Sequence, residues 1–289
     1  MFKAFKKIRL LSSVFILFAG FFLFTGCQTT FKLKGNYVTN PEVYPESSLC
    51  PPVIEWEPLQ EGFEITSYKI RSLGVSWHCV KIDLDNPKLH VHIEPHKNNI
   101  GSIFKVKDFA KATKSVAAIN TTPFELPNKT YVPVGIIKIN GEEIAPPVER
   151  YCAFVLSKNE DNHFRAGIID RQTQGAFDDY LYAVGGFFTI YKDNQIISFH
   201  KGKRSRSGCG ISHDGRYLYL MTVTPFFHPT DRNGLNYEEC AIIFRKLGCT
   251  KAMQFDGGHS CALVVNGKQV ESTFMQRKVP IALGFSVEE

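Results

Sequence analysis

Alternation of apolar and polar residues is the main pattern along this sequence. Residues 63–72, 75–84 and 88–95 alternate with period two and are rich in β-branched and aromatic side chains, which predicts three strands. Shorter apolar segments predict further strands, at 115–120, 134–139, 151–156, 164–169, 187–191, 195–199, 250–255, 261–267 and 279–285. The polar letters KDNQ between two of these strands predict a hairpin turn.

Two segments instead have helical spacing. Residues 102–114 place apolar side chains on one face, and Ser102 is the expected N-cap. A second helix is predicted from Asn236, where Asn236 and Glu239 form a capping box and Gly248 supplies the stop. Many strands and few helices indicate an α+β fold, a strand-rich mixed sheet with a few packed helices in a single domain.

The first 26 residues have the features of an export signal. Basic residues precede an apolar run, Leu10–Phe24, which is shorter than the roughly 20 residues that a spanning helix needs. Gly26 and Cys27 follow, as in a bacterial lipoprotein signal, so residues 1–26 are predicted to be removed and Cys27 to carry lipid. A plain secreted product and an uncleaved anchor remain open alternatives.

Residues 27–60 are polar and contain five prolines, which predicts a tether without regular elements between a lipid bilayer and a folded domain at 61–289. The expected location is the bacterial cell envelope, with the domain anchored to a membrane and facing the periplasm or the exterior.

Charge and cysteine content narrow the classes of function. The chain has 289 residues and a net charge of +6, of which four positive charges lie before residue 27, leaving +2. Nucleic-acid binding is therefore not expected, since it requires a concentrated basic stripe. Of eight cysteines, seven remain after Cys27, so at least one is free or pairs between chains. Burial as inert thiols is the simplest interpretation for several of them.

The segment KAMQFDGGHSCALVVNGK joins two apolar strands through a polar break. Asp256 ends the first strand, and Gly257 and Gly258 permit backbone angles and close approaches that side chains forbid. Consecutive amides there can form an anion-binding concavity. His259 adds a titratable group and Ser260 a hydroxyl. A tight hairpin turn explains the same letters, so the motif alone leaves both interpretations open.

A longer stretch of the sequence favours a functional site over a simple hairpin turn, because the region from Arg206 to Phe285 resembles the phosphodiester glycosidase family. FDGGHSCALVVNG matches the family's strand that ends in Asp-Gly-Gly and is followed by a small residue, a serine and a strand closing with Asn-Gly. SRSGCGISHDGRYLYLMTV matches its arginine beside a glycine strand, with a turn and an apolar strand. GLNYEECAIIFRKLGC matches the Gly-Leu-x-x-x-Glu helix between them.

The resemblance extends upstream with less force, through AVGGFFTIYKDNQ and AAINTTPF. Asn120 and Phe124 are retained, whereas Thr121 and Thr122 stand where the family has two glycines. This departure predicts a change either in backbone shape or in substrate class. His259 stands where glycine is frequent, which predicts an altered site on that side too.

The resemblance implies hydrolysis of a glycosyl phosphodiester. Such a site needs a carboxylate near the anomeric carbon and cations or amides at the phosphate. Asp256 is the first candidate for the carboxylate, and Arg206 can hold two phosphate oxygens in a fork. The amides of Gly257 and Gly258 would supplement it.

Four further residues complete the hypothesis. Asn120 and Ser260 would hydrogen-bond the substrate, and His259 could protonate a leaving group. Glu239 is a second carboxylate candidate, although its place in the capping box explains it equally well. No cofactor is expected, and the expected partners are a glycan or sugar-phosphate substrate and the bilayer.

A rival site lies in HVHIEPH, where His90, His92, Glu94 and His96 share one face of a strand and could bind a metal. The favoured interpretation is the solvated face of an edge strand. The sequence thus predicts an exported hydrolase. A non-catalytic surface lipoprotein that binds a phosphorylated glycan or a partner protein is the alternative, and a metal-dependent hydrolase is a third possibility.

Overall fold

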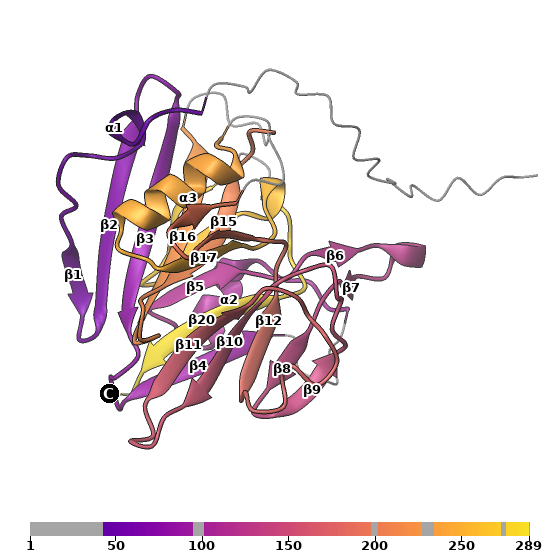
Figure 1. Cartoon of the computed structure of the whole chain (residues 1–289). Helices are drawn as coiled ribbons and strands as arrows, with labels where there is room; N and C mark the ends of the chain where they lie inside the picture. The colour runs from indigo at the N-terminus through magenta and orange to yellow at the C-terminus, as the bar shows by residue number, and fades with distance from the viewer. Residues whose placement is uncertain (1–42, 95–100, 198–201, 227–233, 273–275, 289) are drawn as a thin grey trace, which may run out of the picture. The chain divides into compact units, whose positions relative to one another are not determined.

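Three antiparallel sheets and one short ribbon make up most of the structure (Figure 1). The computed structural model describes residues 43–94, 101–197, 202–226, 234–272 and 276–288. They belong to one compact unit, Pro41–Glu289. Strands outnumber helices, so the prediction of an α+β fold is confirmed.

The largest sheet has eight strands, and its order interleaves strands from the beginning, middle and end of the chain. Its members, in spatial order, are β1 (Glu57–Gln60), β2 (Phe63–Ile70), β3 (Val75–Asp83), β16 (Tyr217–Pro225), β15 (Arg206–Ile211), β17 (Lys251–Gln254), β13 (Thr189–Lys192) and β14 (Gln195–Ile196). The predicted KDNQ hairpin is confirmed, because Lys192 pairs with Gln195 and both turn residues have positive φ.

Two five-stranded sheets and a ribbon account for the other strands. The first sheet contains β11 (Phe164–Ile169), β10 (Ala153–Lys158), β12 (Tyr182–Gly185), β8 (Ile137–Ile139) and β9 (Glu142–Ala145). The second contains β19 (Lys268–Ser272), β18 (Ala262–Val265), β5 (Ala117–Asn120), β20 (Ala282–Val287) and β4 (Leu89–Glu94). The ribbon pairs β6 (Phe124–Glu125) with β7 (Val132–Pro133).

The α-helices of the described ranges pack on the sheets: α1 (Glu46–Leu49), α2 (Val106–Ala112) and α3 (Tyr237–Lys246). The predicted capping box at Asn236 and Glu239 is present. The predicted cap at Ser102 is wrong, because α2 begins at Val106 after Lys105, which makes no side-chain cap. None of the helices in the described ranges has the length and apolar character needed to cross a membrane.

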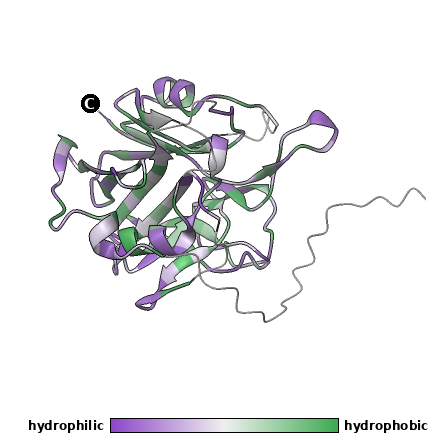
Figure 2. Cartoon of the chain, turned by 90° about the horizontal axis from the view of Figure 1, so that it is seen from above, coloured by the Kyte–Doolittle hydropathy of each residue, from purple (hydrophilic) through white to green (hydrophobic). Residues whose placement is uncertain are grey.

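The core lies between the sheets, and both faces of the large sheet are buried. Along β3, Val80 and Ile82 join a central cluster shared by all three sheets, whereas Trp77 and Cys79 join a second cluster with α1 and α3. Figure 2 shows the same arrangement, with hydrophobic strands at the centre and hydrophilic loops outside. This double burial explains why the strand sequences are so rich in apolar residues.

Part of the predicted tether is folded. Leu49 is fully buried, and its carbonyl accepts a hydrogen bond from Nε1 of Trp77 at 2.9 Å. Residues 57–60 pair with β2. The expectation that residues 27–60 lack regular elements is therefore wrong from residue 46 onward, because apolar side chains in this segment complete the core cluster against β3 and α3. Residues 1–42, which include the predicted signal and Cys27, lie outside the described residues.

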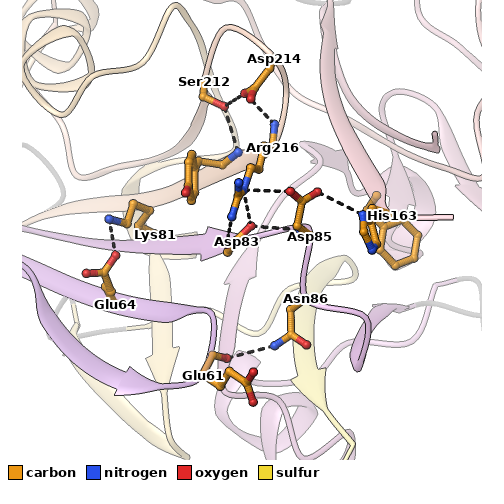
Figure 3. A network of polar contacts seen from close by, with 12 residues as sticks. Glu61, Glu64, Lys81, Asp83, Asp85, Asn86, His163, Ser212, Asp214 and Arg216 are labelled. Carbon is orange, nitrogen blue, oxygen red and sulfur yellow. Dashed lines mark hydrogen bonds and ion pairs between the residues drawn. The ribbon is translucent and has the colours of Figure 1, made fainter. Parts of the chain in front are cut away.

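An ion-pair network ties the large sheet to the first five-stranded sheet (Figure 3). Arg216 donates to both carboxylate oxygens of Asp83, at 2.9 and 2.7 Å, and lies 3.0 Å from Asp85. Arg165 on β11 donates to Asp85 at 2.6 Å. Burial acts to raise the pKa of Asp83, but the Arg216 hydrogen bond and charge outweigh it, so this pKa is lowered. The network has a structural explanation, since each charge faces an opposite one.

Candidate active site

The Asp-Gly-Gly break lies where the chain passes from one sheet to another. β17 ends at Gln254 in the eight-stranded sheet, and β18 begins at Ala262 in a five-stranded sheet. The connection includes a 3-10 turn, η3 (Gly258–Ser260). The strand breaks here because its two halves belong to different sheets, so the segment is more than a hairpin turn within one sheet.

Asn120, at the end of β5, fixes this connection. The Asp256 amide donates to the Thr121 carbonyl at 2.7 Å, and Asn120 Nδ2 donates to the Asp256 carbonyl at 2.7 Å. Asn120 Oδ1 accepts from Ser207 Oγ at 2.7 Å and from the Ala262 amide at 3.0 Å. Asn120 is 1% exposed, so it acts as a buried bracket that joins β5, β15 and the start of β18.

The two glycines allow the turn to approach β15 closely. A Cβ on Gly257 would lie 2.7 Å from the Ser205 carbonyl oxygen, which is closer than side-chain carbons tolerate. Gly258 has a φ of +61° and donates its amide to the same oxygen at 2.9 Å. The glycines are therefore required by a backbone contact at one position and by a left-handed conformation at the next.

The Asp256 carboxylate is partly enclosed and held by its own turn. Burial raises the pKa of Asp256 to about 6, against opposing effects from the Ser260 hydroxyl, the Gly257 amide and the Arg277 charge. The Gly257 amide donates to Oδ1 at 3.0 Å. A carboxyl group with a raised pKa that still retains donors is typical of residues in acid, base or nucleophilic roles.

Arg206 lies beside this turn, on the neighbouring strand. Because Ser207 O accepts from the Phe255 amide and Ser205 O from the Gly258 amide, the backbone of Arg206 faces Asp256 across the ladder. The Arg206 residue is 6% exposed, and its guanidinium donates through Nε to the Leu235 carbonyl at 2.9 Å and lies 4.4 Å from the Tyr237 ring centroid. Much of its donor capacity is thus directed into the protein.

Arg277, which the sequence analysis did not single out, approaches from the exposed side. Its amide donates to the His259 carbonyl at 2.8 Å, and its charge lowers the pKa of Asp256. Its guanidinium lies 5.9 Å from the ring centroid of Phe124. No signal in the sequence could have located it, because only the folded chain brings this loop back to the turn.

The remaining predicted residues divide into two groups. Ser260 and His259 belong to the turn itself, Ser260 buried and His259 partly exposed. Glu239 belongs to the first turn of α3 and is fully buried. Its carboxylate accepts from the Asn236 amide at 2.9 Å and the Tyr44 amide at 3.4 Å, and it pairs with Lys203 at 3.3 Å.

We expect Glu239→Ala to lower the free energy of unfolding by about 1–3 kcal/mol, because it removes the capping box and leaves buried donors without an acceptor. Turnover by the folded fraction should persist. Urea denaturation and turnover measured on the same preparation check this. A folded variant without turnover would instead assign Glu239 to the chemistry.

The backbone at Thr121 and Thr122 does not have the left-handed conformation that would favour glycine. Neither has a positive φ, and both are buried. Among the described residues, neither hydroxyl oxygen has a hydrogen-bond partner. The backbone at Thr121 and Thr122 is therefore not left-handed, and a change in backbone shape and a change in substrate class both stay predictions.

The histidine strand is β4, an edge strand. His92 Nε2 lies 2.7 Å from Ser286 Oγ, and His90 is 3.6 Å from Glu288. His96 lies outside the described residues. Among the residues that are described, no group of three or more His, Cys, Asp and Glu side chains is arranged to hold a metal ion.

The cysteines are buried thiols. All seven that follow Cys27 are free and buried in the structure: Cys50, Cys79, Cys152, Cys209, Cys240, Cys249 and Cys261. Burial raises the pKa of Cys261, which lies beside the site, to about 12, so its thiol is protonated near neutral pH.

Comparisons with known proteins place the chain in a family. The sequence model of the phosphodiester glycosidase family matches residues 113–286, and the chain belongs to this family. The match covers β5, the Asp256 turn and Arg277. A search of curated proteins finds no match.

Solved structures share the fold. A hypothetical protein from Synechocystis aligns with a TM-score of 0.63 and 15% identity, over 82% of this chain, which spans 64% of that protein. The catalytic domain of zebrafish N-acetylglucosamine-1-phosphodiester alpha-N-acetylglucosaminidase, auto-inhibited by its pro-peptide, aligns with a TM-score of 0.59 and 17% identity, over 83% of this chain and 84% of that one. A Burkholderia pseudomallei protein described as exported aligns with a TM-score of 0.60 and 13% identity, over 73% of this chain and 74% of that one.

Proposed function

We propose that this protein hydrolyses a glycosyl phosphodiester at the Asp256 turn. The observation that carries the proposal is a partly enclosed carboxylate that accepts from the Gly257 amide and feels the charge of Arg277. It stands in a turn whose backbone is fixed by Asn120, inside the segment that matches the phosphodiester glycosidase family. When a sugar 1-phosphodiester is hydrolysed, positive charge develops at the anomeric carbon and negative charge on the leaving phosphate. The Asp256 carboxylate complements the first charge and the Arg277 guanidinium complements the second.

In the proposed reaction, the bond between the anomeric carbon and the phosphate oxygen breaks and water supplies the new oxygen on carbon. The ionised Asp256 carboxylate stabilises the positive charge that develops on the sugar. Arg277 stabilises the departing phosphate monoester. The amides of Gly257 and Gly258 instead support the turn, since they donate to Asp256 Oδ1 and to the Ser205 carbonyl. Arg206 holds β15 to the segment before α3 through the Leu235 carbonyl, and His259 and Ser260 belong to the turn that carries Asp256. A phosphate monoester is a good leaving group, so the reaction makes little demand for acid assistance.

Ionisation of Asp256 predicts the pH dependence. Because its pKa is raised to about 6, the carboxylate is largely protonated at pH 5 and ionised at pH 7. We expect kcat/KM to rise with pH through an apparent pKa near 6. A profile that falls over the same interval would instead assign the neutral carboxyl a proton-donating role.

Export and anchoring are a separate part of the proposal. The lipoprotein-type signal at 1–26 supports a lipid anchor on Cys27 and a location at the cell envelope. The related fold of an exported Burkholderia pseudomallei protein agrees with export. Metabolic labelling with a fatty-acid probe should label the wild type and not Cys27→Ala.

A non-catalytic glycan-binding lipoprotein is the second candidate, favoured by Thr121 and Thr122 in place of two glycines. Incubation with a panel of sugar 1-phosphodiesters distinguishes the two. An enzyme releases free sugar and phosphate monoester in proportion to time and protein concentration. Saturable binding without release, over the whole panel, would support the second candidate.

A further inference from the structure

A short ribbon leaves the site directly beside Asp256. Thr121, whose carbonyl anchors the Asp256 amide, is followed three residues later by the start of β6, and β6 and β7 project from the body of the molecule (Figure 1). The two ends of the ribbon are joined by the Val134 amide, which donates to the Pro123 carbonyl at 2.7 Å. Among the described residues, no apolar side chain of β6 or β7 belongs to a core cluster. The ribbon therefore offers surface beside the site that the core does not require.

One face of the ribbon is apolar. Phe124 pairs with Pro133, so Leu126 and Tyr131 lie on the same face as Phe124 by the alternation of strand residues. The Phe124 and Tyr131 rings are 5.3 Å apart, and Leu126 is 51% exposed. In the described part of the chain the exposed large hydrophobic residues are Leu126, Val132 and Val53. Val132 pairs with Glu125 and so lies on the opposite face of the ribbon.

A cation stands where this face meets the site. Arg277 lies 5.9 Å from the Phe124 ring centroid, and its amide is bonded to His259 in the Asp256 turn. Within the described residues its guanidinium makes no ion pair with a carboxylate. The order of groups is thus carboxylate, guanidinium and apolar face, which matches a sugar, a phosphate and an apolar group joined in one molecule.

We propose that the phosphate of the substrate is esterified to an apolar alcohol, with Arg277 binding the phosphate and the face formed by Phe124, Leu126 and Tyr131 binding the apolar chain. This inference rests on the proposed function and names its substrate class, a glycosyl phosphate of a lipid-like alcohol. Three prolines, Pro123, Pro127 and Pro133, restrict the backbone of the ribbon, so little conformational freedom is lost on binding.

Binding of the leaving group alone tests the inference without turnover. Calorimetry would compare methyl phosphate with octyl phosphate below its micelle concentration. The wild type should bind octyl phosphate at least about tenfold more tightly, since part of the chain leaves water. Leu126→Ser should lower this ratio of affinities several-fold. Arg277→Gln should weaken binding of both compounds and retain most of the ratio.

Val53→Ser is the matched control, because it removes an exposed hydrophobic residue of another region, which lines a hollow with Pro51 and Tyr68. It should leave the ratio unchanged. Equal affinity of the wild type for the two phosphates, or an equal loss in Leu126→Ser and Val53→Ser, would overturn the inference. Cleavage of a glycosyl methyl phosphate tests the proposed function separately, so the two failures can be told apart.

Discussion

Asp256→Asn is expected to lower kcat/KM for a glycosyl phosphodiester by about 1,000-fold or more, because it removes the charge that stabilises the transition state. The fold should persist, since an asparagine Oδ1 can still accept from the Gly257 amide. Stability at pH 7 should be unchanged or slightly higher, because burial already disfavours the ionised carboxylate.

Turnover with a fluorogenic or chromogenic sugar 1-phosphodiester, together with urea denaturation, would measure both effects. Asp161→Asn, an exposed carboxylate on a turn, serves as the control and should retain full activity. A folded Asp256→Asn variant with more than about a tenth of wild-type activity would remove Asp256 from the chemistry.

Gly257→Ala is expected to affect both stability and turnover. The added Cβ would meet the Ser205 carbonyl oxygen at 2.7 Å, and that oxygen cannot retreat without breaking its hydrogen bond from the Gly258 amide. We expect a loss of about 1–3 kcal/mol in the free energy of unfolding. Displacement of the turn should also lower turnover by about 100-fold, since small misplacements of reacting groups are costly.

Gly167→Ala is the matched control for the crowding in Gly257→Ala. There the Cβ would meet a side-chain methyl of Val155 at 2.9 Å, which can move, instead of a backbone oxygen. Its cost should be below about 1 kcal/mol. If thermal denaturation gave the two alanine variants equal stability, the close approach of the Asp256 turn to β15 would not be a real constraint.

Local patterns predicted much of the fold because each strand carries its own signal. The alternation in β2 and β3 and the capping box of α3 depend on neighbouring residues alone, and all are present. The folded position of residues 46–60 was not predictable in this way. Its proline-rich sequence lacks a period, and its stability depends on distant partners such as Trp77.

The site was predictable to the extent that it is contiguous in sequence. Asp256, Gly257 and Gly258 predict an unusual backbone, and the family resemblance added Asn120 as a substrate-binding residue. Its bond to the Asp256 carbonyl was not predicted. The place of Arg277 in the site was not predictable, because only the folded chain brings its amide to the His259 carbonyl. The orientation of the Arg206 guanidinium toward the Leu235 carbonyl likewise depends on packing that no local pattern encodes.

The position of bond cleavage is the most direct test of the central claim. Hydrolysis of a sugar 1-phosphodiester in ¹⁸O-labelled water, followed by ³¹P NMR of the released phosphate monoester, reports which bond breaks. Attack at the anomeric carbon predicts a phosphate monoester without ¹⁸O. Incorporation of ¹⁸O into the phosphate would show attack at phosphorus and contradict a glycosidase mechanism at Asp256.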